Sequence, residues 1–392
     1  MSESNQLRRL VLVIHSLDGG GAEHVATEMA NQWIAMGYDV TLITLDSAEK
    51  DRFPLSPQVS RVALDLMGRS GNVFQAFFAN RTRVRRLRAA LREAAPQVIV
   101  SLTDKTNVLT LLAARRLKIG VVACEWTDPR HHRIGRLWEL LRRWTYPMCR
   151  ALVVQTRNVH DVCRPFVGTR PIHVVPNFVR EPEVRRGNRD TQTRRVVALG
   201  RLAPEKGFDL LIASFARLAD RHPDWNLLIL GEGPHRDVLE RGIHRHALEG
   251  RVQLPGWEES PAQPLVDSDL FVLSSHYEGF PNALLEAMAS KVACISFDCP
   301  SGPGEIIRDG VDGLLVPPQD VAALTAAMDE LMSDENRRHE IARRATEVLE
   351  RFSVQTHFER WDAILRETHS PVNPAADEEP SRSAARPKPD GQ

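Results

Sequence analysis

The sequence His276-Tyr-Glu-Gly-Phe-Pro-Asn-Ala-Leu-Leu-Glu-Ala-Met-Ala289 follows an apolar run at residues 269–274. That run has the length and composition of a buried strand. Pro281 suits a first helical position and Asn282 is a candidate cap, so a helix is predicted to begin there. The helix is apolar nearly all round, which predicts burial, yet Glu286 lies in its middle. A carboxylate in such a place is costly unless something hydrogen-bonds to it.

A second acid, Glu278, lies in the turn before this helix. The start of a helix presents unpaired backbone N–H groups, and these groups bind anions. Two carboxylates, the Gly279 turn and a helix N-terminus together predict a site for a phosphorylated, hydroxyl-rich ligand.

Strand-length and helix-length segments alternate along both halves of the chain, which predicts an α/β protein with two doubly wound, Rossmann-like domains. The strands predicted in the first half are Arg9–His15, Asp39–Leu45, Gln97–Ser101, Val121–Cys124, Ala151–Gln155 and Ile172–Val175. The predicted helices there are Gly21–Met36, Val73–Ala94, Thr106–Leu117 and Gly135–Met148.

The predicted N-terminal domain spans residues 1–176, and a polar linker follows at residues 177–195. The predicted C-terminal domain spans residues 196–352 and precedes a helix at 353–368, for which a return to the first domain is one option. The tail at residues 369–392 lacks apolar periodicity and is predicted to be disordered.

Composition narrows the class of protein. A length of 392 residues exceeds what one core usually supports, and 42% hydrophobic with 26% charged residues is typical of a globular protein. The five cysteines form no C-x-x-C pair, which argues against a disulfide framework or structural zinc and favours the cytoplasm. No apolar run approaches the ~20 residues of a membrane-spanning helix.

Charge is divided unevenly along the chain. Residues 1–180 hold 26 Lys and Arg against 15 Asp and Glu, whereas the remainder holds 25 against 36. Such an excess predicts that the first half faces a polyanion, either nucleic acid or an anionic membrane. Residues 135–146 form a basic, aromatic, amphipathic segment and residues 81–88 are rich in Arg, which favours a membrane surface over nucleic acid. The alternative is an ordinary core-facing helix with solvated arginines.

Three other strand ends carry candidate site residues. Arg201 and Lys206 follow the predicted strand at 196–200 and are suited to clamp a diphosphate and stabilise a departing phosphate without a metal. Gly231-Glu-Gly233 and Gly19-Gly20-Gly21 follow other strands and let a ligand approach the backbone closely. Each of these motifs alone is equally consistent with an ordinary loop.

Residues Glu125 to His132 follow the predicted strand that ends at Cys124, so they are expected to face the interdomain cleft. The adjacent His131 and His132 invite a metal site. However, neighbouring histidines on a loop diverge and no i, i+4 spacing accompanies them, so no metal is predicted.

Together these segments resemble the large family of retaining glycosyltransferases of GT-B fold usually numbered four, also described as glycosyl transferases group 1. The resemblance is carried by Gly19-Gly-Gly-Ala-Glu23, Val175-Pro-Asn177, Gly200-Arg201 through Lys206-Gly207, Gly231-Glu-Gly233, and the E-x7-E segment Glu278 to Glu286. Phe297-Asp298 with Gly302-Pro303 resembles the branch that builds bacterial surface polysaccharides and lipid-linked oligosaccharides.

The resemblance implies a role for each matching residue. Arg201 and Lys206 would bind the diphosphate, Glu278 would meet the donor sugar, and Glu286 the ribose. The residues expected to approach the donor through their backbone are Gly20, Gly21, Gly231, Gly233, Gly279, Phe280, Pro281, Asn282 and Ala283. Many members carry a His where this chain has Glu125, with His131 and His132 further on. Glu125 is expected to bind substrate on the acceptor side, and the identity of the acceptor-side polar group stays open.

The implied function is a metal-independent, retaining transfer of a hexose or N-acetylhexosamine from a UDP-sugar to a lipid-linked or polysaccharide acceptor. The enzyme would work at the inner face of the cell membrane, with no cofactor beyond the donor and no nucleic-acid partner. Two alternatives stay open: a UDP-sugar epimerase of the same fold, and a non-catalytic subunit hinted at by Glu125.

Overall fold

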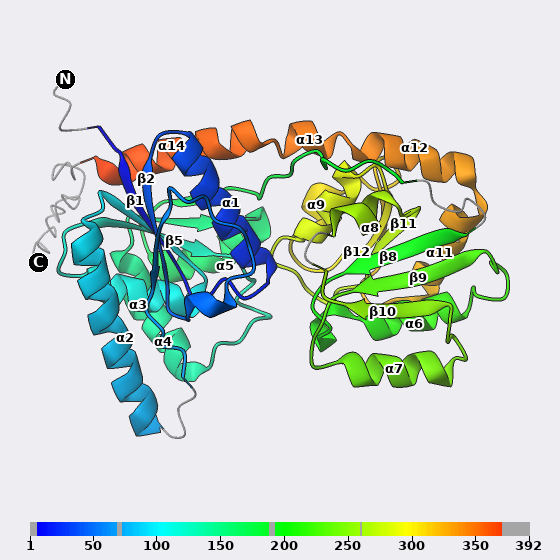
Figure 1. Cartoon of the computed structure of the whole chain (residues 1–392), viewed down its shortest axis with the longest axis horizontal. Helices are drawn as coiled ribbons and strands as arrows, with labels where there is room; N and C mark the ends of the chain where they lie inside the picture. The colour runs from blue at the N-terminus through cyan, green and yellow to red at the C-terminus, as the bar shows by residue number, and fades with distance from the viewer. Residues whose placement is uncertain (1–5, 69–72, 188–192, 259–260, 371–392) are drawn as a thin grey trace, which may run out of the picture.

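The computed structural model describes residues 6–68, 73–187, 193–258 and 261–370 (Figure 1). The tail predicted to be disordered lies almost entirely outside these described residues. The described chain forms two α/β domains, each built on a fully parallel sheet.

The N-terminal domain is built on a parallel sheet in the order β3-β2-β1-β4-β5-β6-β7. Its strands are β1 (Arg9–Ile14), β2 (Asp39–Thr44), β3 (Ser60–Ala63), β4 (Val98–Leu102), β5 (Gly120–Glu125), β6 (Ala151–Val154) and β7 (Ile172–Val174). Its helices are α1 (Gly21–Ala35), α2 (Val73–Ala94), α3 (Asp104–Ala114), α4 (Arg136–Thr145) and α5 (Arg157–Val167). The core residues of α1 lie on one face of the sheet, and those of α2, α3 and α5 lie on the other.

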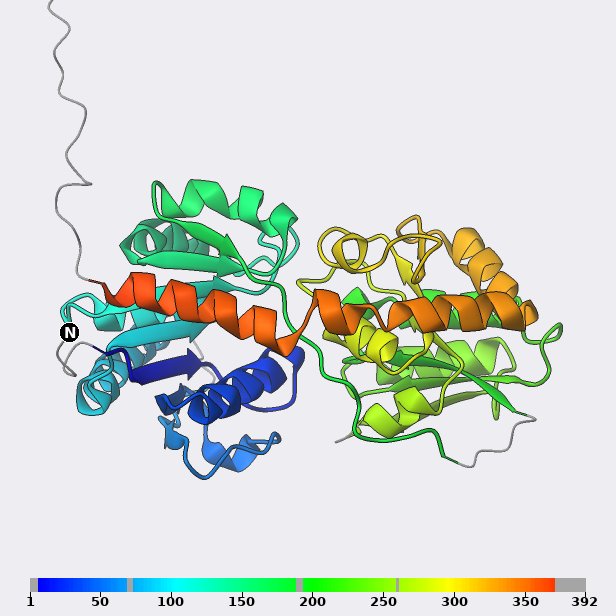
Figure 2. The same ribbon diagram turned by 90° about the horizontal axis from the view of Figure 1, so that it is seen from above.

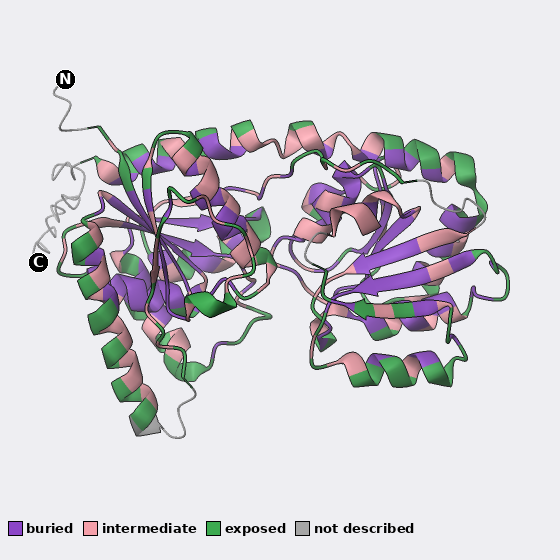
Figure 3. Cartoon of the chain, in the orientation of Figure 1, coloured by how far each residue is buried: buried purple, intermediate pink, exposed green. Residues whose placement is uncertain are grey.

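The C-terminal domain repeats this plan with the strand order β10-β9-β8-β11-β12-β13. Its strands are β8 (Arg194–Leu199), β9 (Trp225–Leu230), β10 (Val252–Gly256), β11 (Leu270–Leu273), β12 (Ala293–Phe297) and β13 (Leu314–Val316). Its helices are α6 (Phe208–Ala216), α7 (Arg236–Arg245), α8 (Ala262–Val266), α9 (Asn282–Ala289), α10 (Pro303–Ile306), α11 (Val321–Ser333), α12 (Glu335–Ala345) and α13 (Val348–Arg351). Central strands of both domains are buried, as Figure 3 shows.

The last described helix, α14 (Val354–His369), returns to the N-terminal domain (Figure 2). Its residues Phe358, Trp361 and Leu365 belong to the same core as α1. The Trp361 ring meets Trp33 edge-on with 5.7 Å between ring centroids, and both indoles are fully buried. The helix therefore covers the face of the sheet that α1 leaves open.

The E-x7-E helix begins differently from the prediction. Pro281 occupies the N-cap position of α9, and Asn282 is the first helical residue. The Asn282 side chain does not cap its own helix, because it bonds instead to residues of the other domain. The buried, apolar character predicted for this helix is confirmed by Leu284, Leu285 and Met288, which are all at most 1% exposed.

Strand order reverses beside β1 and β4 in the first sheet and beside β8 and β11 in the second. Ligands of open parallel sheets bind beyond the carboxyl ends of strands at such reversals. The loops after β1 and β11 meet there, since Asn282 contacts Gly21. Within the described residues no helix is both long and apolar enough to cross a membrane.

Candidate functional site

The centre of the site is a largely buried ion pair between Lys206 and Glu278, whose side chains are 23% and 10% exposed. The Lys206 ammonium Nζ lies 2.7 Å from Glu278 Oε1, and the Ser275 hydroxyl donates to the same oxygen over 2.6 Å. Gly207, which follows Lys206, has φ 58°, and a Cβ there would lie 2.1 Å from the carbonyl oxygen of Ser274. The loop after β8 can therefore lie directly against the end of β11, which brings the two charged side chains together.

The pair keeps Lys206 charged. Burial disfavours the ammonium and would lower its pKa, but the charge of Glu278 and the hydrogen bond to it outweigh burial, so the pKa of Lys206 is raised. Arg201 lies on the same loop with its side chain exposed. The Arg201 guanidinium has no hydrogen-bond or ion-pair partner among the described residues, so its five N–H donors are available to an anion.

The predicted glycines of the next loop have a packing reason. A Cβ on Gly231, whose φ is 142°, would lie 2.0 Å from the Gly200 carbonyl oxygen, and one on Gly233 would lie 2.3 Å from that of Leu202. Both glycines therefore hold the loop after β9 against the loop that carries Arg201. Their contact with a donor stays a prediction.

The N-terminal end of α9 faces the N-terminal domain. Asn282 Nδ2 donates to the Gly21 carbonyl over 3.4 Å, and Asn282 Oδ1 accepts from Asn177 Nδ2 over 2.7 Å. A Cβ on Gly279 would lie 1.9 Å from the Trp126 carbonyl oxygen, so the two domains approach closely at this glycine.

Side chains around this turn serve the fold. Phe280 is 7% exposed and its ring packs on Phe352 at 5.9 Å, while Ala283 adjoins the same core. Contact of this segment's backbone with a donor stays a prediction. Gly20 is the N-cap of α1, and its neighbour Gly21 faces Asn282 across the domain interface.

The Glu286 carboxylate differs from that of Glu278 because it accepts no hydrogen bond from any described residue. Its nearest basic atom is His24 Nδ1 of the other domain, 3.9 Å away. Although 29% of the Glu286 side-chain surface is exposed, surrounding protein raises its pKa to about 7 by desolvation. His24 gives little compensation, because burial lowers its own pKa. Two carboxylate oxygens are thus free to accept hydrogen bonds from a ligand.

The sequence did not reveal three contacts that join the domains. Ser301 Oγ donates to Asp128 Oδ2 over 3.0 Å, and the His131 ring stacks on Tyr277 with centroids 5.6 Å apart. The Arg157 backbone N–H at the start of α5 donates to Glu305 Oε1 over 2.9 Å. The position of these residues at strand ends and helix starts indicated that they could belong to a site. It could not indicate their partners, because each partner lies in the other domain.

Glu125 lies elsewhere than predicted. Its side chain is 1% exposed and accepts a hydrogen bond from the Tyr146 hydroxyl over 2.6 Å, with Arg142 Nε 3.9 Å away. Burial raises the pKa of Glu125 to about 7, with Arg142 opposing this shift. Its carboxylate faces the interior of the N-terminal domain and not the domain interface, so the expected acceptor-side position is wrong in this structure. The reason is that β5 extends through Glu125 and buries it.

His131 and His132 diverge, as adjacent loop histidines should. His131 stacks on Tyr277, whereas His132 lies 3.3 Å from Asp104, which raises the pKa of His132 chiefly through a hydrogen bond. Across the described ranges no three His, Cys, Asp or Glu side chains gather as a metal site would require. Metal independence stays a prediction, because it concerns the reaction.

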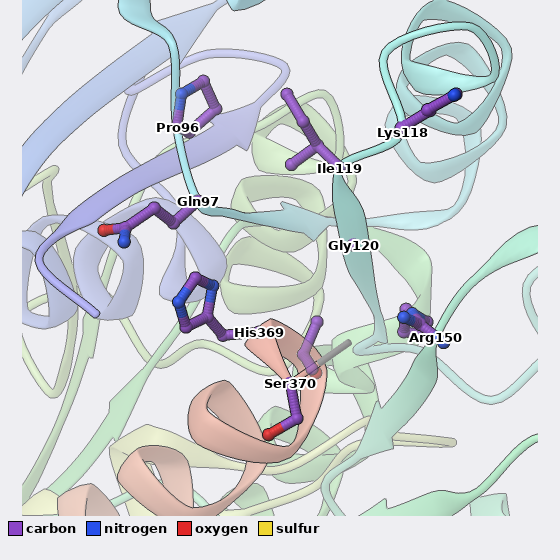
Figure 4. A pocket seen from close by; sticks show the side chains of 9 residues that line it. Pro96, Gln97, Lys118, Ile119, Gly120, Arg150, His369 and Ser370 are labelled. Carbon is purple, nitrogen blue, oxygen red and sulfur yellow. The ribbon is translucent and has the colours of Figure 1, made fainter. Parts of the chain in front are cut away.

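A separate depression of about 420 Å³ lies at the amino ends of β4 and β5, beside the end of α14 (Figure 4). It is lined by Pro96, Gln97, Lys118, Ile119, Gly120, Arg150, Thr368, His369 and Ser370. None of the predicted site residues lines it, and ligands of parallel sheets bind at the carboxyl ends. Its cations adjoin the C-terminal end of α14, where they complement the helix dipole.

Taken together, the loops near the domain interface present an exposed guanidinium, a partly buried ammonium, a helix N-terminus and an unbonded carboxylate. Cations and helix N–H groups bind phosphate oxygens, and a carboxylate accepts hydrogen bonds from sugar hydroxyls. This set fits a nucleotide diphosphate sugar.

Known families match both domains. The family described as Glycosyltransferase Family 4 matches residues 19–181, and that described as Glycosyl transferases group 1 matches residues 179–348. The two matches overlap at residues 179–181, in the linker, and together they include every strand of both sheets except β1.

Two named glycosyltransferases match this chain over nearly their whole length. The chain is 26% identical to the amylovoran biosynthesis glycosyltransferase AmsD of Erwinia amylovora, over 91% of this chain and 99% of that protein. It is also 26% identical, over 92% and 99%, to a Campylobacter jejuni α-1,4-N-acetyl-D-galactosaminyltransferase whose name specifies a diphospho-undecaprenol glycan. An exopolysaccharide phosphotransferase of Streptomyces coelicolor is 34% identical, but the match covers 56% of this chain and only 24% of that protein.

Solved structures share the fold. Sucrose-phosphate synthase of Thermosynechococcus elongatus superposes with a TM-score of 0.81 at 17% identity, covering 92% of this chain and 98% of that one. TarM of S. aureus, solved in complex with UDP, superposes with a TM-score of 0.77 at 14% identity, covering 92% and 100%. The two-domain GT-B architecture predicted from the sequence is confirmed.

Proposed function

Because the chain belongs to the glycosyl transferases of group 1, in the GT-B family numbered four, we propose that it transfers a hexose or N-acetylhexosamine from a UDP-sugar with retention of configuration. The observation that carries this proposal is the ion pair between the largely buried Lys206 and Glu278, whose carboxylate precedes the helix that carries the unbonded Glu286. One acid is held at a fixed place by a cation, and the other has both oxygens free.

The donor would lie along the loops after β8 and β11. Arg201, Lys206 and the N–H groups at the start of α9 would bind its diphosphate, and Glu286 would accept hydrogen bonds from the ribose hydroxyls. Hydrogen bonds from two ribose hydroxyls would stabilise the ionised Glu286 carboxylate and so offset the desolvation that raises its pKa. The solved complex of TarM with UDP supports the choice of uridine diphosphate.

In the proposed reaction the bond between sugar C1 and the diphosphate oxygen breaks while an acceptor hydroxyl oxygen bonds to C1 on the same face. The hydroxyl proton passes to the departing diphosphate oxygen, so no external base is needed. Arg201 and Lys206 would stabilise the charge that develops on the leaving diphosphate, and Glu278 would hold Lys206 in place and meet the donor sugar. Retention follows from attack and departure on one face.

The acceptor we propose is a growing glycan on a lipid diphosphate or polysaccharide, reached from the inner face of the cell membrane. The names of the two full-length relatives support this class of acceptor. The N-terminal domain would hold it, and closure of the interface around Gly279 and Trp126 would bring it to the donor.

The test is release of UDP from a panel of UDP-hexoses and UDP-N-acetylhexosamines, with a short polyprenyl-diphosphate N-acetylhexosamine as acceptor. We expect wild type to turn over, and Glu278→Ala, Lys206→Ala and Arg201→Ala each to lose about 100-fold or more, since charge stabilisation at the leaving group is removed. Arg201 is exposed, so its variant tests the proposal without disturbing the core.

The matched control is Lys291→Ala, which removes an exposed lysine just beyond the far end of α9 and should keep full activity. Undiminished turnover in all three site variants would sink the proposal. Following the UDP-sugars by NMR without acceptor separates an epimerase, which would interconvert them. Tight binding of UDP with no turnover across the acceptors would instead support a non-catalytic subunit.

A further inference from the structure

Helix α4 exposes three large apolar side chains to solvent and buries an arginine. A surface helix normally turns its apolar stripe to the core and its charges to water. On α4, Leu137, Leu140 and Trp144 are 63%, 66% and 50% exposed, whereas the guanidinium of Arg142 is completely buried. The inner side of this helix packs Trp138 and Leu141 against the core together with the buried Arg142, while three large apolar side chains remain on its outer side.

The exposed residues of α4 form one stripe. Leu137, Leu140 and Trp144 follow one another at spacings of three and four, which places them on a single helix face. Exposed Arg136 and Arg143 flank this stripe. Arg115, at the end of α3, holds its guanidinium 5.6 Å from the centre of the Trp144 ring. Cations thus border the apolar stripe along its length.

A second apolar group lies on α2. Phe77 and Phe78 are 65% and 63% exposed, with ring centroids 5.8 Å apart. Helix α3 packs against both α2 and α4, so the two groups share one face of the sheet, away from α14 (Figures 1 and 3). Of all large apolar side chains that the structure describes, the five most exposed are Leu137, Leu140, Trp144, Phe77 and Phe78.

We propose that this face docks on an anionic lipid bilayer. The docking face consists of Leu137, Leu140 and Trp144 of α4 with Phe77 and Phe78 of α2, bordered by the exposed arginines Arg81, Arg85, Arg86, Arg115, Arg136 and Arg143. Leucine and aromatic side chains enter the boundary between headgroups and acyl chains, and arginines bind anionic headgroups around them. Tryptophan favours this boundary because its indole is apolar with one polar N–H.

Charge favours lipid over a second copy of this chain. Two copies meeting through the docking face would bring their arginine borders together, and like charges at an interface repel. The acid nearest the stripe, Glu139, is turned inward and lies 3.7 Å from the buried Arg142, so it does not neutralise that border. An anionic bilayer satisfies both the apolar stripe and the cations.

The docking face lies beside the reaction site. Residues 126–135 connect the start of α4 to the end of β5, and they carry Trp126 and His131, which contact Gly279 and Tyr277 of the other domain. A docked α4 would hold this edge of the domain interface at the bilayer, where a lipid-anchored acceptor resides. Only the link to the acceptor rests on the proposed function; the docking itself does not.

The experiment is co-sedimentation of the full chain with vesicles of pure phosphatidylcholine and of phosphatidylcholine with 30–40% phosphatidylglycerol, roughly the anionic content at which arginine attraction is felt. We expect binding only to the anionic vesicles. The variant Leu137→Ser/Leu140→Ser/Trp144→Ser should bind at least about tenfold more weakly, because apolar insertion is lost. Binding of the wild type should weaken as salt is added, because salt screens the attraction between arginines and anionic headgroups. Arg136→Glu/Arg143→Glu should abolish binding.

The matched control is Val238→Ser/Val311→Ser, which removes two exposed apolar residues of the C-terminal domain, 38% and 39% exposed, and should bind as wild type does. Brominated lipid should quench tryptophan fluorescence of wild type but much less that of Trp144→Phe, which retains binding. Three outcomes would overturn the proposal. The serine variant could bind as strongly as wild type, wild type could fail to bind, or the chain could form dimers through this face that exclude vesicles. A second measurement separates this failure from failure of the proposed function. If UDP stabilises the protein against heat in the absence of lipid, the donor site is intact even where docking fails.

Discussion

At the scale of single residues, the two glutamates of the E-x7-E segment have opposite surroundings. Glu278 is 9% exposed, and one of its oxygens is held by both Lys206 and Ser275. Glu286 has only a distant histidine, 3.9 Å away. The first carboxylate is therefore fixed before a ligand arrives, and the second is left to be satisfied by one.

Donor binding should depend on pH through Glu286. Its pKa of about 7 means that the carboxylate is ionised at pH 8 and mostly protonated at pH 6. An ionised carboxylate accepts hydrogen bonds from hydroxyls more strongly than a protonated one. We expect the KM for the donor to rise by roughly tenfold from pH 8 to pH 6 with little change in kcat. The reason is that the ionised fraction of Glu286 falls by roughly tenfold over this range.

The variant Glu286→Gln should show a high KM that no longer changes with pH in this range. Glu93→Gln alters an exposed glutamate near the end of α2 and should retain the wild-type profile. An unchanged pH dependence in Glu286→Gln would assign the titration to another group.

Among the elements, α4 is held to the domain by its buried Arg142. The guanidinium lies 3.9 Å from Glu125 and 5.5 Å from the centre of the Phe166 ring. Its three nitrogens donate no hydrogen bond to any described protein atom. Such a pair stabilises little on balance, but loss of one partner leaves the other charge buried and uncompensated.

Arg142→Met should therefore destabilise the fold by about 3–5 kcal/mol, measured as the free energy of urea unfolding. Arg143→Met changes the neighbouring exposed arginine of the same helix and should cost less than about 0.5 kcal/mol. Adding Glu125→Gln to Arg142→Met should recover much of the loss, since no charge is then stranded. Equal stability of the two single variants would show that Arg142 is not buried as described.

The sequence predicted most elements because their patterns are local. Eleven-residue α5 was missed, since Pro165 lies inside it and interrupts a helical pattern. Its N-cap signal, Thr156, was present and accepts a hydrogen bond from Val159. Strand β3 was missed because Ser60–Ala63 is short and only partly buried at the sheet edge, so it lacks a continuous apolar run.

For the molecule as a whole, the site depends on contacts between domains. The sequence predicted which residues lie at strand ends, and the fold brings Lys206 and Glu278 together there. It could not predict that Asp128 would meet Ser301, or that Trp126 would meet Gly279, because no local pattern records how two domains pack. Glu125 was misplaced for a related reason, since its burial depends on Tyr146 and Arg142 folding over it.

Gly279→Ala should hold the domains apart. A Cβ at this position would lie 1.9 Å from the Trp126 carbonyl oxygen, and backbone on both sides leaves no flexible atom to yield. We expect kcat to fall at least about tenfold, because a displacement of about 1 Å misaligns the reacting groups. The radius of gyration from X-ray scattering should increase, with little change in secondary structure.

Gly242→Ala on α7 is the control, because a Cβ there meets nothing within 4 Å. It should keep activity and gain up to about 1 kcal/mol of stability, as Ala replaces Gly in a helix. Full activity and an unchanged radius in Gly279→Ala would mean that the domains do not need this contact.

The return of α14 also bears on how the chain reaches its native state during synthesis. Domains generally fold as they emerge from the ribosome, N-terminal domain first. Here the residues that pack against Trp33 and its neighbours include Phe358, Trp361 and Leu365. These three residues are translated only after the whole C-terminal domain. The nascent N-terminal domain therefore exposes an uncovered apolar face until translation passes residue 369, and it is in this interval that a chaperone has a surface to bind.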